Sequence, residues 1–271
     1  MPALRATSRV AASPSPVSIQ TAMPCSRSSR TASADPTFGV AKISPFELTT
    51  TSYVDRNISR LTPANYYAKV FNMAMRSMRR DTVGMIFNGD GQASNDMFGI
   101  KTAKNMAGST IFATLEVEEI GPDLLTELMF AYGGDEELGG TCRLYLNKKD
   151  LLALGKLRGT NEKRRLFDIV PDAANPNTGT IREGGTIVPY SISGKLTALS
   201  ASAKGSAAIQ TMVYGDPMNY ELGLFGAYTV RVDESVKAVE RMLTVLGDAM
   251  VGGNLIVDKG FVVATLPATG G

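Results

Sequence analysis

Residues 62–91 read TPANYYAKVFNMAMRSMRRDTVGMIFNGDG and predict a long helix that runs directly into a glycine-rich turn. The hydroxyl of Thr62 can cap the first free backbone N–H groups, and Pro63 suits the first helical turn because its missing N–H costs nothing there. Apolar side chains then recur at steps of three and four residues, which puts them on one broad face. These are Tyr66, Tyr67, Val70, Phe71, Ala74, Met75 and Met78. The helix is expected to end between Thr82 and Phe87.

The turn Asn88-Gly89-Asp90-Gly91 is predicted to be structural. Asn-Gly and Asp-Gly are general turn formers, and glycine tolerates a positive φ. The stretch departs from the dinucleotide-binding fingerprint, because Ser94 stands where a third glycine belongs and a helix precedes it. It also departs from a calcium loop, because Ala93 takes the glycine position and Gly99 takes the position of the bidentate glutamate. No metal and no cofactor is therefore predicted here.

A second informative stretch runs from Tyr214 to Leu266 and reads YGDPMNYELGLFGAYTVRVDESVKAVERMLTVLGDAMVGGNLIVDKGFVVATL. It opens with Gly215-Asp216, continues through β-prone residues from Glu221 to Val232, and ends in a predicted strand from Gly260 to Leu266. Between the two stretches, Leu144-Tyr145-Leu146-Asn147 predicts a strand followed by a helix over residues 149–158.

The order of these features resembles the major capsid proteins of tailed bacteriophages, which have the Hong Kong 97 shell fold. The resemblance covers about Thr37 to Leu266 and includes the segment Met242-Leu243-Thr244. It implies an α+β fold with a peripheral domain of one long spine helix and long strands, and an axial domain with a mixed sheet flanked by helices. The implied parts are a flexible basic N-terminal arm (1–36), the return strand of an extended loop (37–61), the spine helix (62–90), the main axial part (91–213), the peripheral strands and connection (214–252) and a C-terminal axial strand (253–271).

The resemblance implies a structural protein rather than an enzyme. Copies would assemble into hexamers and pentamers of an icosahedral head around double-stranded DNA, in the host cytoplasm, and end in the virion capsid. Implied partners are the chain itself, a portal, a separate scaffolding protein and, as an option, decoration proteins. The basic side of the spine helix, with Lys69, Arg76, Arg79 and Arg80, would then contact DNA non-specifically. The alternative is that these side chains face solvent or pair across subunits.

The resemblance also suggests that this shell lacks the lysine-asparagine crosslink of the family's type member. At the acceptor position before Met242 the chain has Arg241, which offers no side-chain carbonyl for attack. The carboxylate position is Asp248, which is shorter than glutamate. The only loop lysine before the spine helix is Lys42, which is more simply an exposed strand residue.

The amino-acid composition excludes several classes of protein and of catalytic or metal site. The chain has 271 residues, 44% of them apolar, and a net charge of +2, which does not require a tightly bound nucleic acid. No apolar run is long enough to span a bilayer. Histidine is absent, which excludes Ser-His-Asp and Cys-His catalysis and any zinc site that contains histidine. Cys25 and Cys142 lie far apart in sequence, so no structural disulfide is expected.

The N-terminal segment leaves two readings open. Residues 1–34 contain four arginines and no acidic residue, and are otherwise mostly small or polar. This composition predicts a flexible arm, but it also fits an organelle transit peptide. The second reading makes the chain an organelle-targeted metabolic enzyme. Ahead of that enzyme, the runner-up function keeps the shell fold: an encapsulin-type nanocompartment protein, whose shell encloses an enzyme instead of a genome.

The remaining sequence predicts a mixed α/β body. A helix is expected over Pro122–Tyr132, and Asn147 is expected to cap a helix whose leucines at 151, 152, 154 and 157 are buried. Residues 172–185 are predicted to form a loop, and residues 186–193 a strand. Residues 219–232 are expected to form peripheral strands that pack on the spine helix, with Leu224 and Val230 buried.

Overall fold

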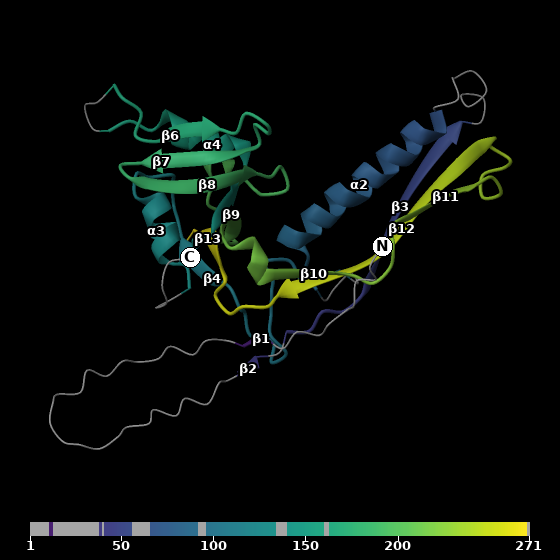
Figure 1. Cartoon of the computed structure of the whole chain (residues 1–271), viewed down its shortest axis with the longest axis horizontal. Coiled ribbons are helices and arrows are strands. Elements are labelled where there is room, and N and C mark those ends of the chain that lie inside the picture. The colour runs from purple at the N-terminus through teal and green to yellow at the C-terminus, as the bar shows by residue number, and fades with distance from the viewer. Residues whose placement is uncertain are drawn as a thin grey trace, which may run out of the picture.

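The computed structural model describes residues 11–12, 38–39, 41–55, 66–91, 96–133, 140–159 and 163–269. Figure 1 shows two lobes: a compact one built on a seven-stranded sheet, and an elongated one in which a single long helix lies along a four-stranded sheet. The predicted arm (1–36) lies outside the described residues except for Ala11–Ala12, as do Thr62, Pro63 and residues 56–61 of the return-strand segment. None of the described helices is long and apolar enough to cross a membrane.

The long helix α2 spans Tyr66–Asn88, so it ends one residue beyond the predicted range and leads at once into the glycine turn. Its length is about 35 Å at 1.5 Å per residue. The buried side faces the four-stranded sheet through Ala74 and Met78, and Met78 is fully buried. Phe71, predicted for the same face, is 44% exposed and lines a hollow with Val230 and Val245 of the sheet. The side chains of Tyr66 and Tyr67 lie outside the described part.

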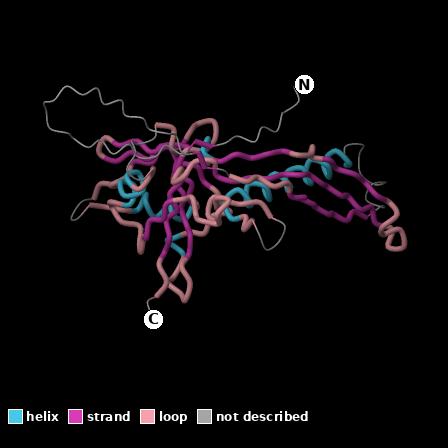
Figure 2. The backbone as a smooth tube through the Cα atoms, turned by 90° about the horizontal axis from the view of Figure 1, so that it is seen from below, coloured by secondary structure: helices cyan, strands magenta, loops and turns pink. Residues whose placement is uncertain are grey.

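The four-stranded sheet is organised around β12 (Met242–Leu255). One edge of β12 pairs along ten residues with β3 (Phe46–Asp55), and the other pairs with β11 (Thr229–Asp233) and then with β10 (Tyr220–Leu224), all antiparallel. Figure 2 shows these strands and α2 extending together away from the compact lobe. The strands at 46–55, 220–224 and 229–233 fall where sequence patterns predicted extended chain.

One part of the peripheral prediction is wrong for the single chain. Leu224 is 47% exposed, and Leu222 and Val232 are also exposed. The strand β10 pairs with the far end of β12, beside Val251 to Leu255, and not under the middle of α2. The strand β11 does contact the helix, and the hydroxyl of Tyr228, just before that strand, lies 3.2 Å from Thr82 Oγ1. An acidic replacement of Leu224 would therefore not bury a charge within one chain.

The compact lobe contains a mixed sheet in the order β4-β13-β9-β5-β8-β7-β6. Its strands are β4 (Ala113–Glu116), β5 (Arg143–Leu146), β6 (Asp168–Pro171), β7 (Thr178–Glu183), β8 (Thr186–Ile192), β9 (Ile209–Gly215) and β13 (Phe261–Leu266). Two helices, α3 (Leu124–Phe130) and α4 (Lys148–Lys156), contribute Leu124, Leu125, Leu128 and Leu154 to the main core. The 3₁₀ turns are η1 (Leu199–Ala201) and η2 (Pro217–Asn219), and a two-residue pair joins β1 (Ala11–Ala12) to β2 (Phe38–Gly39).

Two sequence predictions for this lobe need correction. Residues 178–183, expected to belong to a loop, form β7, because Ile181 is buried and the Gly184-Gly185 turn closes a hairpin with β8. Leu152, expected on the buried side of α4, is 59% exposed, since only Leu154 points fully into the core. The predicted cap is confirmed: Asn147 Oδ1 accepts a hydrogen bond from the N–H of Lys149 at 3.1 Å.

Candidate functional site

The turn after α2 is held by backbone hydrogen bonds on both of its sides. The N–H of Gly89 donates to Met85 O at 2.8 Å, continuing the helix, and the N–H of Gly99 donates to Gly89 O at 2.9 Å. Asp90 and Phe98 form an antiparallel bridge. The returning chain then binds the end of the helix itself, because the N–H of Ile100 donates to Ile86 O at 2.8 Å. The chain thus folds back on the helix as soon as the helix ends.

This close return explains the glycines in Asn88-Gly89-Asp90-Gly91. A Cβ on Gly89 would lie 2.2 Å from Met97 O and 2.8 Å from Met85 O, which is closer than any carbon can approach. Gly91 has a φ of +69°, and a Cβ there would overlap the ring of Phe98. No group of three or more Cys, Asp or Glu side chains suited to a metal occurs among the described residues. The arrangement of Gly89 and Gly91 is that of a structural junction.

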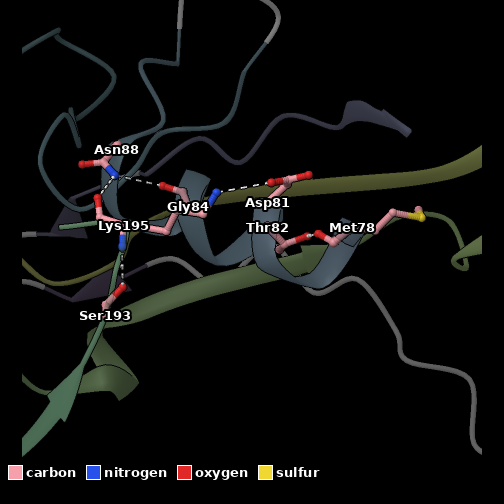
Figure 3. Close-up of polar contacts among 7 residues, drawn as sticks. All are labelled: Met78, Asp81, Thr82, Gly84, Asn88, Ser193 and Lys195. Atoms are coloured by element: carbon pink, nitrogen blue, oxygen red, sulfur yellow. Dashed lines mark hydrogen bonds and ion pairs between the residues drawn. The ribbon is translucent and has the colours of Figure 1, made fainter. Parts of the chain in front are cut away.

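The loop after β8, in the compact lobe, also contacts the end of α2 through Lys195 (Figure 3). Asn88 Nδ2 donates to Lys195 O at 2.9 Å and to Gly84 O at 3.4 Å. The ammonium of Lys195 returns to the helix and lies 3.3 Å from Asp81 Oδ1. Both charged side chains are about 40% exposed, so this ion pair contributes little stability. The Asn88 amide is the stronger link, and it fixes the helix against the loop that follows β8.

The basic residues predicted for the spine helix lie apart from this junction. Lys69, Arg76, Arg79 and Arg80 are all exposed, and none of them forms a salt bridge with another described residue. At 100° per residue, Lys69, Arg76 and Arg80 follow one line on the helix, opposite the buried Met78. They form a positive stripe along the face that points away from the sheet.

A second junction involves Gly215-Asp216, the other turn of the family pattern. Asp216 Oδ1 accepts from the N–H of Met218 at 2.9 Å, and its other oxygen accepts from Thr141 Oγ1. Asn219 Nδ2 then donates to Gly260 O and to the hydroxyl of Tyr132, each at 3.0 Å. Burial is the main reason that the pKa of Tyr132 rises to about 12. These bonds tie the start of β10 to the compact lobe.

Two buried polar side chains that fix the fold were not identified from sequence, Asp150 inside the compact lobe and Asn254 on β12. Asp150 is fully buried, and its carboxylate accepts from the N–H groups of Leu199 at 3.0 Å and Ser200 at 2.8 Å. Asn254, also fully buried, donates to Lys42 O at 3.2 Å and Lys104 O at 3.1 Å. Asp150 lies in the helix α4 and Asn254 in the strand β12. The residues next to each of them in sequence give no indication that the polar side chain is buried.

The residues aligned with the crosslink of the type member lie at different places along β12. Arg241 precedes β12 in a left-handed turn with a φ of 55°. Asp248 lies in mid-strand, where it accepts from Thr229 Oγ1 at 2.7 Å and lies 3.5 Å from Arg231 Nη2. Lys42 is exposed near the opposite end of the strand, where its carbonyl binds Asn254. Within one chain the structure therefore does not bring these three together.

Comparison with known proteins agrees with this architecture. The sequence pattern of the Phage capsid family matches residues 7–266. A search of curated proteins finds no match. Among solved structures, the capsid of an empty GTA particle superimposes with a TM-score of 0.65 at 14% identity, covering 91% of this chain and 81% of that one. The Gordonia phage Cozz structure gives 0.59 at 12% identity, covering 92% and 79%.

A shell protein of another kind is also similar. The holo-SrpI encapsulin complex of Synechococcus elongatus gives a TM-score of 0.54 at 14% identity, covering 87% of this chain and 78% of that one. At such identities the structural matches establish the fold, which is of the Hong Kong 97 type, and the sequence match over residues 7–266 establishes the family. This chain belongs to the phage capsid family and is a major capsid protein.

Proposed function

We propose that this protein assembles into hexamers and pentamers that enclose double-stranded DNA in an icosahedral head. The observation that supports this most is the combination of a family match over nearly the whole chain with the two-lobed fold of phage capsids. A portal and a separate scaffolding protein would assist assembly in the host cytoplasm. The family match begins at residue 7 and so includes most of the basic N-terminal segment, which favours an assembly arm over a transit peptide.

In this proposal the two lobes are the peripheral and axial domains. The peripheral domain comprises α2 with β3, β10, β11 and β12, and the axial domain comprises the seven-stranded sheet with α3 and α4. The predicted boundary after residue 252 falls inside β12, which continues to Leu255. We therefore place that boundary after Leu255, where the strand ends.

Negative-stain microscopy of the purified protein, produced alone and with a scaffolding protein from the same genome, tests this function. Closed shells of uniform diameter are expected. The second candidate, suggested by the SrpI similarity, is an encapsulin-type shell that encloses protein. Treating the particles with nuclease and then extracting their contents distinguishes the two, because a phage head protects DNA. A small soluble oligomer under all conditions would overturn the assignment.

The positive stripe Lys69, Arg76 and Arg80 is proposed to face the packaged DNA. Its side chains are exposed, lack ion-pair partners among the described residues, and would attract phosphates without sequence preference. Replacing all three by glutamine should leave shell formation intact and reduce the DNA retained per particle, most clearly at raised salt. A stripe located on the outer surface of assembled shells would contradict this placement.

A further inference from the structure

An open hollow at one edge of the seven-stranded sheet is lined by arginine. It has a volume of about 910 Å³ and lies between the segment before β6 and the tip of the β7-β8 hairpin. Its charged lining residues are Arg164, Arg165, Arg182 and a single acid, Asp168. Asp168 faces Arg182 across the β6-β7 pair. The two remaining cations, Arg164 and Arg165, give the hollow a surplus of positive charge.

Arg164 and Arg165 have no acidic partner among the residues that the structure describes. Arg164, Arg165 and Arg182 are exposed, and within the described ranges none of them forms a salt bridge. Like charges that line one hollow repel one another, and an anionic group placed between them offsets that repulsion. The hollow therefore has the chemistry of a site for an acidic ligand.

The opposite edge of the same sheet carries the complementary charge. The edge strand β4 ends at Glu116, and Glu118 and Glu119 follow it, all exposed. Glu118 pairs with Lys204 at 2.7 Å. Glu116 and Glu119 form no salt bridge with any other residue that the structure describes. Two carboxylates at this edge are thus available to a cation from outside the chain.

Distance prevents the two edges from satisfying each other within one subunit. β4 and β6 are the outermost of seven strands, so about six spacings of 4.8 Å, or about 29 Å, separate them. That is several times the Debye length of about 8 Å at physiological salt. Complementary surfaces at opposite edges of a subunit produce head-to-tail contacts, and such contacts close into rings when the rotation between copies allows it.

We propose that the hollow formed by Arg164, Arg165 and Arg182 binds the Glu116–Glu119 segment of the adjacent copy within a hexamer or pentamer. This inference rests on the proposed function, because it needs a ring of copies. Each subunit would donate its acidic edge to one neighbour and receive the acidic edge of the other. The contact would weaken as salt increases.

Charge reversal tests the contact. The variant R164E/R165E and the variant E116R/E119R should each reduce the yield of closed particles roughly tenfold or more, because like charges then meet across the interface. The variant with all four changes should recover particles to within about threefold of wild type, since opposite charges meet again. K148E/K149E is the matched control: it reverses two adjacent exposed lysines in the first turn of α4, and it should assemble as wild type does.

Circular dichroism of the unassembled subunits establishes that each variant is folded. Folded double variants that assemble at wild-type yield, or a quadruple variant that stays as defective as either double variant, would overturn the contact. Normal R164E/R165E shells that fail to retain DNA would also overturn it, and would assign the hollow to nucleic acid. If the wild-type chain forms no particles, the proposed function fails before the contact is tested, so the two failures are distinguishable.

Discussion

Gly89 is a position in the Asn88–Gly91 turn where even a small side chain is expected to destabilise the fold. Because a Cβ there would lie 2.2 Å from Met97 O, Gly89→Ala requires the backbone to move and should destabilise the subunit by about 1–3 kcal/mol. Chemical denaturation of unassembled protein measures the loss. Gly121→Ala is the control, because no atom lies within 4 Å of its added Cβ, and its cost should stay within about 0.5 kcal/mol. Equal stability of the two variants would contradict the close packing at Gly89.

Lys101 gives a prediction about pH. It is buried, its ammonium donates to Gln210 O at 3.0 Å, and desolvation lowers its pKa from 10.5 to about 8. Between pH 8 and 10.5 the unfolded chain binds more protons at this site than the folded chain does, so the free energy of unfolding rises with pH there. Below pH 8 the burial penalty is constant and at its largest.

The variant Lys101→Met removes this dependence while preserving the length of the side chain. Relative to Lys101→Met, wild type should therefore gain stability as pH rises from 8 to 10, and the difference should be flat between pH 6 and 7. Denaturation series at these pH values, compared pairwise, cancel the contributions of other titrating groups. A difference that does not change with pH would show that Lys101 has an ordinary pKa in the folded protein.

Residue roles were only partly predictable from the sequence. The structural nature of the Gly89 turn followed from turn chemistry alone, and so did the Asn147 cap. Asp150 and Asn254 were missed because their partners lie 49 to 212 residues away in sequence, and no local pattern encodes such pairs. A buried polar side chain becomes visible only when tertiary packing shows what surrounds it.

At the scale of elements, α2 provides two methionines that test its orientation. Met78 is fully buried against the sheet, where a Cβ on Gly247 would lie only 2.6 Å from its sulfur, whereas Met73 is 69% exposed on the opposite side. Met78→Asp should cost about 3–5 kcal/mol, since it buries an unpaired charge. Met73→Asp should cost at most about 1 kcal/mol, mainly through helix propensity.

Soluble yield and thermal unfolding of the two variants measure this difference. Met73→Asp is the matched control for Met78→Asp, because both substitutions replace a methionine of the same helix by the same charged residue. Similar losses of stability in both variants would contradict the packing of α2 on the sheet through Met78. Loss of particles in Met73→Asp without loss of subunit stability would instead indicate a contact between copies on that face.

The periodic elements were the most predictable from sequence. α2, β5, β8 and β13 follow directly from apolar spacing and turn residues. β7 was missed because Gly179, Thr and Arg dilute its apolar pattern, so that only Ile181 marks the buried side. The exposure of Leu224 could not be foreseen either, because a strand's burial depends on which part of its partner it pairs with.

For the whole molecule, the positions of Arg241, Asp248 and Lys42 along β12 bear on how a shell of this protein would be stabilised. The side chains at Arg241 and Asp248 are not expected to supply crosslink chemistry: the first has no carbonyl to attack, and the second is already engaged by Thr229 and Arg231 across the β11-β12 pair. Lys42 lies beside the far end of β12, about 40 Å from Arg241 for a 14-residue strand. Shell stability is therefore expected to come from burial and charge pairing between copies.

The final prediction is that mature particles contain no covalent oligomers of this chain. Boiled denaturing gels with reductant should show one band near the chain mass of 28.8 kDa. A reductant-resistant ladder from wild-type particles would contradict the expectation, and mass spectrometry of the joined peptides would identify the lysine and acceptor involved.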